Sequence, residues 1–142
     1  MKSIKSLALI VGLSISFFSN AQSIPTVDEV NNFFMNQQML ITSREGGPIY
    51  GTFYFLEIHY CPQGYGLYGR SSKQTVMGNY QTNNWQEFGT WKVIEQNGLV
   101  GLFYTVNSTG AQNFVPVYKL ADGSFSVGEG YTIVHQGQAI CN

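Results

Sequence analysis

The sequence predicts a mainly β fold: an antiparallel meander that closes into a small barrel or half-barrel of about seven or eight strands, with one N-terminal α-helix. Three observations lead to this fold class. Residues 51–142 alternate apolar and polar side chains with the period of a strand. Asn97-Gly98 and Asp122-Gly123 are pairs that tight hairpin turns favour. One stretch, about residues 26–40, has apolar residues at helical spacing instead.

Residues 1–21 have the layout of a secretory signal peptide. Lys2 and Lys5 precede an apolar run, and small residues at Ser19 and Ala21 follow it. The run is shorter than the roughly 20 apolar residues that cross a bilayer as a helix. A buried N-terminal helix is the alternative. The sequence therefore predicts an exported bacterial protein, periplasmic or extracellular, in which residues 22–142 form a single β-barrel domain.

Charge argues against two classes of partner. After residue 21 the chain has eight acidic and five basic residues, a formal net charge of −3, and the basic residues do not cluster. A nucleic-acid backbone and an anionic membrane surface both require closely spaced cations. We therefore expect neither as a partner, and no second apolar stretch predicts a membrane span.

The expected helix begins at Thr26, which with Glu29 forms a capping box. Its apolar stripe would pack on the sheet or plug a barrel end, because the segment has no Lys or Arg with which to lie on a membrane. The stripe consists of Val27, Val30, Phe33 and Phe34.

The first long strand is expected over residues 51–61, before a turn at Pro62. Alternation divides its side chains between two faces. One face carries Tyr54, Leu56, Ile58 and Tyr60, and the other carries Phe53, Phe55, Glu57, His59 and Cys61. A second strand follows, and a further turn is expected at Asn83-Asn84.

Two hairpins complete the meander. A two-residue turn at Asn97-Gly98 places Trp91 opposite Tyr104, on the face suited to a core. A two-residue turn at Asp122-Gly123 would place Leu120 opposite Phe125 and Lys119 opposite Ser126.

At this point the chain resembles two groups of proteins. Gly89-Thr90-Trp91 is similar to the Gly-x-Trp element of lipocalin-like (calycin) barrels, although here it lies in the middle of the chain. With the Tyr-x-Leu at residues 118–120 and the following Asp-Gly, it also resembles small exported bacterial β-domains of unknown function. The resemblance implies a barrel, and no lipocalin binding residue can be carried over by position.

Cys61 and Cys141 are the chain's two cysteines, and in an oxidising compartment we expect them to pair. Two free thiols are the alternative. The bridge would close a loop of about 80 residues and stabilise the fold by about 4 kcal/mol in the chain-entropy model.

No catalytic or metal-binding residue and no cofactor is predicted. Glu57, His59 and Cys61 share a strand face, yet nothing at motif spacing supplies a nucleophile or a ligand set. A surface metal site at His59 and His135 is an alternative, should barrel closure bring them together.

The predicted function is non-enzymatic binding, with two candidate surfaces. A small apolar or aromatic ligand inside the barrel would be lined by Tyr54, Tyr60, Trp91, Tyr104 and Tyr118, unless these residues simply fill the core. The alternative is a protein-interaction domain, such as a periplasmic inhibitor or envelope accessory factor. Its surface would use Tyr65, Tyr68, Arg70 and Trp85. The sequence identifies neither the small molecule nor the envelope or extracellular protein.

Overall fold

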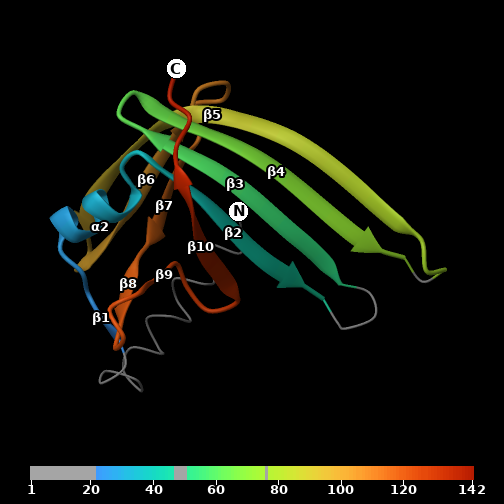
Figure 1. The fold of residues 1–142 in the computed structure, drawn as a ribbon, viewed down its shortest axis with the longest axis horizontal. Helices are drawn as coiled ribbons and strands as arrows, with labels where there is room; N and C mark the ends of the chain where they lie inside the picture. Colours follow the sequence, from blue (N-terminus) through green and yellow to red (C-terminus); the bar gives the residue numbers. More distant parts are fainter. Residues whose placement is uncertain (1–21, 47–50, 76) are drawn as a thin grey trace.

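The computed structural model describes residues 22–46, 51–75 and 77–142, so the predicted signal peptide lies outside the described residues (Figure 1). Within these ranges the fold is mainly β with one helix, as predicted, and no helix is long and apolar enough to cross a membrane. The elements are β1 (Gln22–Ser23), α2 (Val27–Phe34), β2 (Gln37–Glu45), β3 (Thr52–Cys61), β4 (Gly64–Gln74), β5 (Tyr80–Gln96), β6 (Leu99–Val106), β7 (Gln112–Pro116), β8 (Tyr118–Leu120), β9 (Phe125–Ser126) and β10 (Tyr131–Gln138).

The strands form two antiparallel sheets. A seven-stranded sheet has the order β10-β2-β3-β4-β5-β6-β7, and a three-stranded sheet has the order β1-β8-β9. The predicted meander is therefore present from β2 to β7, and the last strand returns to lie beside β2. Among the described residues β7 and β10 each pair on one side only in the larger sheet, so the predicted closure into a barrel is not found there.

The helix has the predicted capping box but is shorter than predicted. Thr26 Oγ1 accepts the Glu29 N–H at 3.1 Å, and Glu29 Oε1 accepts the Thr26 N–H at 3.2 Å. The helix ends at Phe34 because Asn36 adopts a left-handed conformation (φ 62°), and its N–H donates to the Tyr60 carbonyl. The prediction of a helix to residue 40 was wrong, since residues 37–40 begin β2.

Of the four predicted turns, those at Pro62 and at Asn97-Gly98 are confirmed. Pro62 and Gln63 join β3 to β4, with Cys61 opposite Gly64. Asn97 and Gly98 both have positive φ, as a type I′ turn requires, and Trp91 lies opposite Tyr104. The Asn83-Asn84 turn was wrong, because β5 runs straight through it.

The second hairpin register was wrong by one residue. The Leu120 N–H donates to the Ser124 carbonyl, and Gly123 has a φ of +86°, which makes a three-residue loop. Lys119 therefore lies opposite Phe125 rather than Ser126, and its ammonium donates to Glu29 of the helix at 2.6 Å.

The larger sheet has two unlike faces. We call the face covered by α2 the inner face and the opposite one the outer face. Ile58, Leu67 and Leu102 belong to the inner face, where they pack in one cluster with Val30 and Phe34 of the helix. The predicted division of residues 53–61 between two faces is confirmed, because the even-numbered residues carry the core.

Strands β2–β5 extend beyond the elements that cover them (Figure 1). We call the covered part, with the helix and β6–β9, the packed end. We call the uncovered far ends of the four strands the arm; they comprise residues 42–45, 52–55, 70–74 and 80–87. Every residue from Tyr80 to Gln86 is exposed, so the arm has little cover on either face at its outermost strand.

Candidate functional site

Most of the residues predicted to line a ligand cavity pack against one another. The Tyr60 ring, fully buried, lies edge-to-face with Trp91 at 5.1 Å and with Phe34 at 5.0 Å between centroids. Tyr104 stacks edge-to-face with Tyr65 at 5.2 Å. The rings of the packed end therefore occupy the volume that the ligand was expected to fill.

The polar atoms of this cluster bind to each other as well. The hydroxyl groups of Tyr60 and Tyr104 share a hydrogen bond of 2.6 Å, and Trp91 Nε1–H donates to the Cys61 carbonyl at 2.8 Å. Tyr65 donates to Glu87 at 3.0 Å. Burial raises the pKa of both Tyr60 and Tyr104, so these phenols stay neutral well into the alkaline range.

The other two predicted lining residues lie apart. Tyr118 is buried in the core, and burial raises its pKa; its hydroxyl has no hydrogen-bond partner among the described residues. Tyr54 is half-buried on the inner face of the arm, where it donates to Glu45 at 3.4 Å. Neither of the two pockets described below includes any of the five predicted lining residues.

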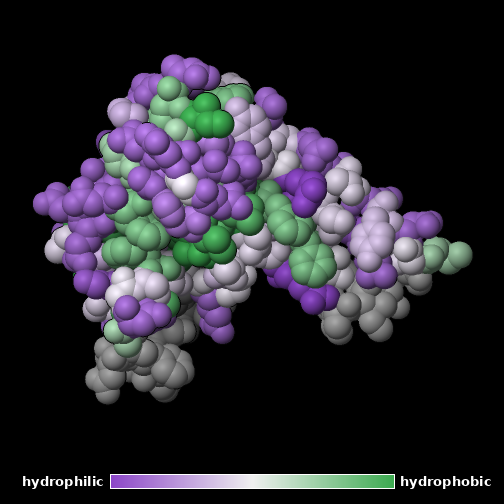
Figure 2. Space-filling view, in the orientation of Figure 1, coloured by the Kyte–Doolittle hydropathy of each residue, from purple (hydrophilic) through white to green (hydrophobic). Residues whose placement is uncertain are grey.

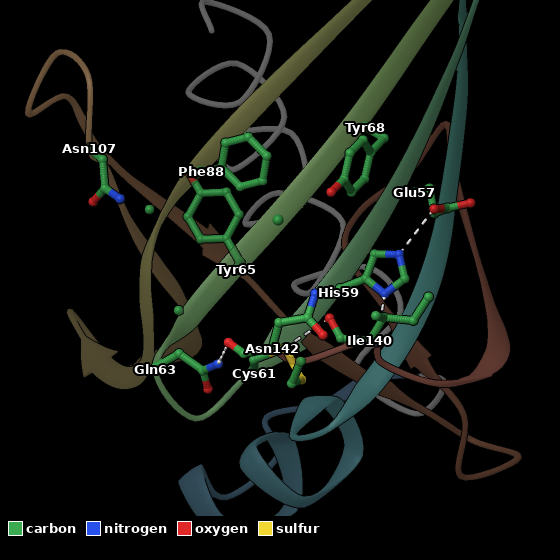
Figure 3. Close-up of a pocket in the computed structure, with 14 residues that line it drawn as sticks. Glu57, His59, Cys61, Gln63, Tyr65, Tyr68, Phe88, Asn107, Ile140 and Asn142 are labelled. Atoms are coloured by element: carbon green, nitrogen blue, oxygen red, sulfur yellow. Dashed lines mark hydrogen bonds and ion pairs between the residues drawn. A yellow bond between two sulfur atoms is a disulfide. The ribbon is translucent and has the colours of Figure 1, made fainter.

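Two neighbouring pockets lie mainly on the outer face. The first, of about 460 Å³, is at the packed end between β3, β4 and the C-terminal residues (Figure 3). The second, of about 890 Å³, extends from it toward the arm. Both are open to solvent, and Glu57 and Tyr68 line both of them. They therefore form one shallow groove along the sheet.

His59 forms part of the wall of the first pocket (Figure 3). Its Nδ1 accepts the Ile140 N–H at 3.0 Å, so the ring proton is on Nε2, which donates to Glu57 Oε2 at 3.0 Å. The ring is almost completely buried. Nδ1 thus holds the C-terminal segment against β3, and Nε2 is occupied by Glu57 of the same strand, so neither nitrogen is directed at an open position for catalysis.

The disulfide fixes the same segment. Cys61 and Cys141 are bonded, as predicted, with their Cα atoms 5.7 Å apart. Gln63 also donates to the Asn142 carbonyl at 3.1 Å. The C-terminal residues are therefore a fixed wall of the first pocket, and the exposed Ile140 side chain stands at its rim.

Aromatic rings run along the groove. Tyr68 lies edge-to-face with His59 on one side and with Phe88 on the other, each at 5.9 Å between centroids. Tyr68 is 42% exposed and Phe88 is 46% exposed. Two large apolar surfaces on adjacent strands are thus available to a partner.

Toward the arm each phenylalanine of β3 has an arginine over its ring. The Arg70 guanidinium lies 4.7 Å from the Phe55 centroid, and that of Arg44 lies 4.8 Å from the Phe53 centroid. Both pairs are direct cross-strand neighbours. On β5, Lys92 lies over the Phe103 ring of β6 at 5.5 Å. Figure 2 shows hydrophobic and hydrophilic groups interleaved on the face of the molecule that lies over β2 and β3.

The four residues predicted for an interaction surface all line the two pockets, although they belong to different faces of the sheet. Tyr68 and Arg70 lie on the outer face and line the groove. Tyr65 is only 4% exposed, because its odd position in β4 directs it into the core. Trp85 belongs to the inner face of the arm, where its ring lies over Gly69; any side chain at that position would displace it.

Sequence reasoning missed Phe53, Phe55 and Phe88 as surface residues. The alternation already placed both β3 phenylalanines on the face of Glu57 and His59. The register of β3 with β2 and β4, which brings Arg44 and Arg70 over these two rings, could not be predicted from the alternation alone.

No metal site is found where the alternative hypothesis put one. Among the described residues no group of three or more His, Cys, Asp or Glu side chains is placed to hold a metal ion. β2 lies between the strands of His59 and His135, and His135 contacts Gln37 instead.

A comparison of the chain with protein-family models, curated proteins and solved structures finds no match. The site must therefore be interpreted from its own chemistry.

Proposed function

We propose that the protein is a non-enzymatic binding module that uses the outer-face groove to bind an extended acidic segment of another exported protein. The observation that carries this proposal is the row of exposed rings, Tyr68 and Phe88, continuous with the arginine-capped phenylalanines of β3. Of the two functions expected from the sequence, the protein-interaction domain is the one that this geometry supports, since the predicted ligand-lining rings pack against each other.

Charge favours an acidic partner. Arg44, Arg70 and Lys92 are the basic residues of the outer face, each over a phenyl ring. The stacked Arg70 guanidinium keeps its N–H edges available, and their forked arrangement matches the two oxygens of a carboxylate. Within the described residues Arg70 has no hydrogen-bond or carboxylate partner, and Glu57 is held by His59.

Shape favours a protein segment over a small molecule. Small ligands bind in enclosed cavities that cover most of their surface, whereas this groove is shallow and open. Aromatic and arginine side chains are the residues that dominate protein interfaces. Amide groups of Asn84 and Gln86 line the second pocket and would serve main-chain groups of the partner.

The proposal includes two further points. We take the curved sheet as a half-barrel, which is supported by its antiparallel meander and by the helix on its inner face. We take the chain as exported, which is supported by its disulfide and by the pattern of residues 1–21.

The test is native mass spectrometry on protein purified from its own cell envelope. We expect a bound protein that is lost from the Tyr68→Ala/Arg70→Gln variant. Tyr80→Ala is the matched control, because Tyr80 is an exposed ring on the same face but outside both pockets. A bound glycan or small molecule, or a protein that all three chains retain, would contradict the proposal.

Affinity then tests the acidic character. A synthetic peptide of alternating Glu and Tyr should bind the wild-type chain, and the same peptide with Gln in place of Glu should bind about tenfold less tightly, the loss of one charge-assisted pair. Arg70→Lys should weaken binding of the acidic peptide as well. A lysine ammonium cannot stack flat on a ring and at the same time donate two parallel hydrogen bonds to a carboxylate. Equal affinity for the two peptides would exclude an acidic partner.

A further inference from the structure

The arm has an unpaired strand at its edge. β5 pairs with β4 from Tyr80 to Gly89, whereas β6 joins it only from Gly89 onward. Among the described residues, 80–87 therefore have a neighbouring strand on one side only. Figure 1 shows β5 as the outermost strand of the arm.

The direction of the free backbone groups follows from one hydrogen bond. The Phe88 carbonyl accepts the Asn107 N–H at 2.9 Å, on the side away from β4. In an antiparallel strand the N–H and C=O of one residue point the same way and the direction alternates along the chain. The ladder from residue 80 to 89 has no register shift. Tyr80, Thr82, Asn84 and Gln86 thus direct both groups outward.

This edge lacks the features that protect free edges. Natural edges use lysines, prolines, bulges or very short strands to prevent pairing. The β7 edge ends in Pro116, and the β10 edge has a register shift between His135 and Gly137. The eight-residue β5 edge, in contrast, contains no proline, and its one charged residue, Glu87, lies at its end and accepts a hydrogen bond from Tyr65.

We propose that this edge pairs with the same edge of a second copy of the chain, antiparallel and with the two-fold axis at Asn83. Tyr80 then lies opposite Gln86 of the other copy, and Thr82 lies opposite Asn84. The outward backbone N–H and C=O groups of all four residues in each copy then have a hydrogen-bond partner in the other copy. This gives about eight backbone hydrogen bonds.

Side chains fit this register. The inner face brings Gln81 opposite Trp85 and Asn83 opposite its own counterpart; neither face brings two like charges together. The arrangement is isologous, so the same segment satisfies both copies and no β5 edge is left to extend into a fibre. The pairing uses the outward backbone groups of β5, and the rings of the groove, Tyr68 and Phe88, remain exposed on the outer face of each copy.

The first measurement is sedimentation equilibrium on the complete chain. We expect a dimer, and we expect Thr82→Lys/Asn84→Lys to weaken it by about tenfold or more, because the added ammonium groups face each other across the axis. Thr132→Lys is the control, an exposed threonine on the outer face of β10 at the other end of the sheet. A wild-type chain that stays monomeric to about 100 μM overturns the proposal, and so does a dimer that the double variant retains.

Cysteine cross-linking tests the register without depending on affinity. Asn83→Cys places a thiol opposite its own copy, within reach of a disulfide. Gln81→Cys, on the same face and strand, places it opposite Trp85. We expect a disulfide-linked dimer from Asn83→Cys only. Equal cross-linking of both variants, or none from Asn83→Cys, overturns the pairing. An envelope protein cross-linked to either variant also overturns it, because the edge would then pair with a different protein.

Discussion

Strands β2–β5 run through both the packed end and the arm, and their aromatic residues meet different surroundings in the two regions. Tyr60, at the packed end, is fully buried beneath Phe34 and Trp91. Tyr80, at the tip of the arm, is 68% exposed, and Trp85 is 38% exposed. The strand chemistry is the same in both, and only the packed end has a second layer. Rings in the arm therefore contribute little to folding and remain available for recognition.

This difference also separates stability from function. The packed end contains the helix, the disulfide and the neutral phenols, all of which hold the strands in place. The outer groove and the β5 edge contain exposed rings and backbone groups, and residues 80–87 pair with a strand on one side only among the described residues. Substitutions at the packed end should therefore lower the free energy of unfolding, whereas substitutions in the groove or at the β5 edge should affect binding and dimerisation.

The largest loss of stability is expected from Tyr60→Ala. Removing a fully buried ring and its bond to Tyr104 should lower the free energy of unfolding by about 4 kcal/mol. Urea denaturation followed by circular dichroism measures it. A loss below about 1 kcal/mol would mean that the packed end is not a close-packed core.

Replacing both Cys61 and Cys141 by Ala should cost about 3 kcal/mol, because the unfolded chain regains the freedom of a long loop. The measurement is the same, and chemical reduction of the wild-type disulfide is the control. Proteolysis should then begin at the C-terminal segment, since it loses its covalent link to β3. Unchanged C-terminal protection would show that His59 and Gln63 hold the segment by themselves.

Stability should fall in alkali. The pKa values of Tyr60 and Tyr104 are raised by burial above the ordinary value of 10, so the neutral phenols favour the folded state. This contribution is complete below about pH 10 and is lost as the pH rises toward the folded-state values, by up to about 1.4 kcal/mol per pH unit for each phenol. Denaturation between pH 8 and 11.5 checks it.

His59→Phe should cost about 1 kcal/mol. An aromatic ring is kept, although a larger one, while the Ile140 N–H loses its acceptor and Glu57 loses its donor. Hydrogen exchange at the Ile140 amide should increase correspondingly. Protection equal to that of the wild type would show that the amide bond to His59 does not form in solution.

The smallest effect is expected from Tyr80→Ala, within about 0.5 kcal/mol, because no second layer covers that ring. Denaturation measures it under the same conditions as Tyr60→Ala. A loss of free energy of unfolding comparable with that of Tyr60→Ala would show that the Tyr80 ring is packed as closely as the rings of the packed end.

Much of the fold followed from local chemistry. Thr26 and Glu29 predicted the start of the helix, Asn97-Gly98 predicted a hairpin with the observed register, and alternation along residues 53–61 predicted two faces correctly. Predictions failed where a local pattern had two solutions. Asp-Gly fits loops of two or three residues, and Asn83-Asn84 fits a turn or an exposed edge strand.

The sequence by itself determined where the helix begins, the two faces of β3, the Asn97-Gly98 hairpin and which cysteines pair, because these depend on neighbours along the chain and on a count of two. Only the tertiary structure decided which aromatic residues are covered. Tyr60 and Tyr80 look alike in a strand pattern, and burial depends on whether a distant helix or sheet lies above the ring. The groove, the arginine-capped rings and the unpaired β5 edge all arise from that long-range placement. The alternation of side chains along one strand contains no information about it.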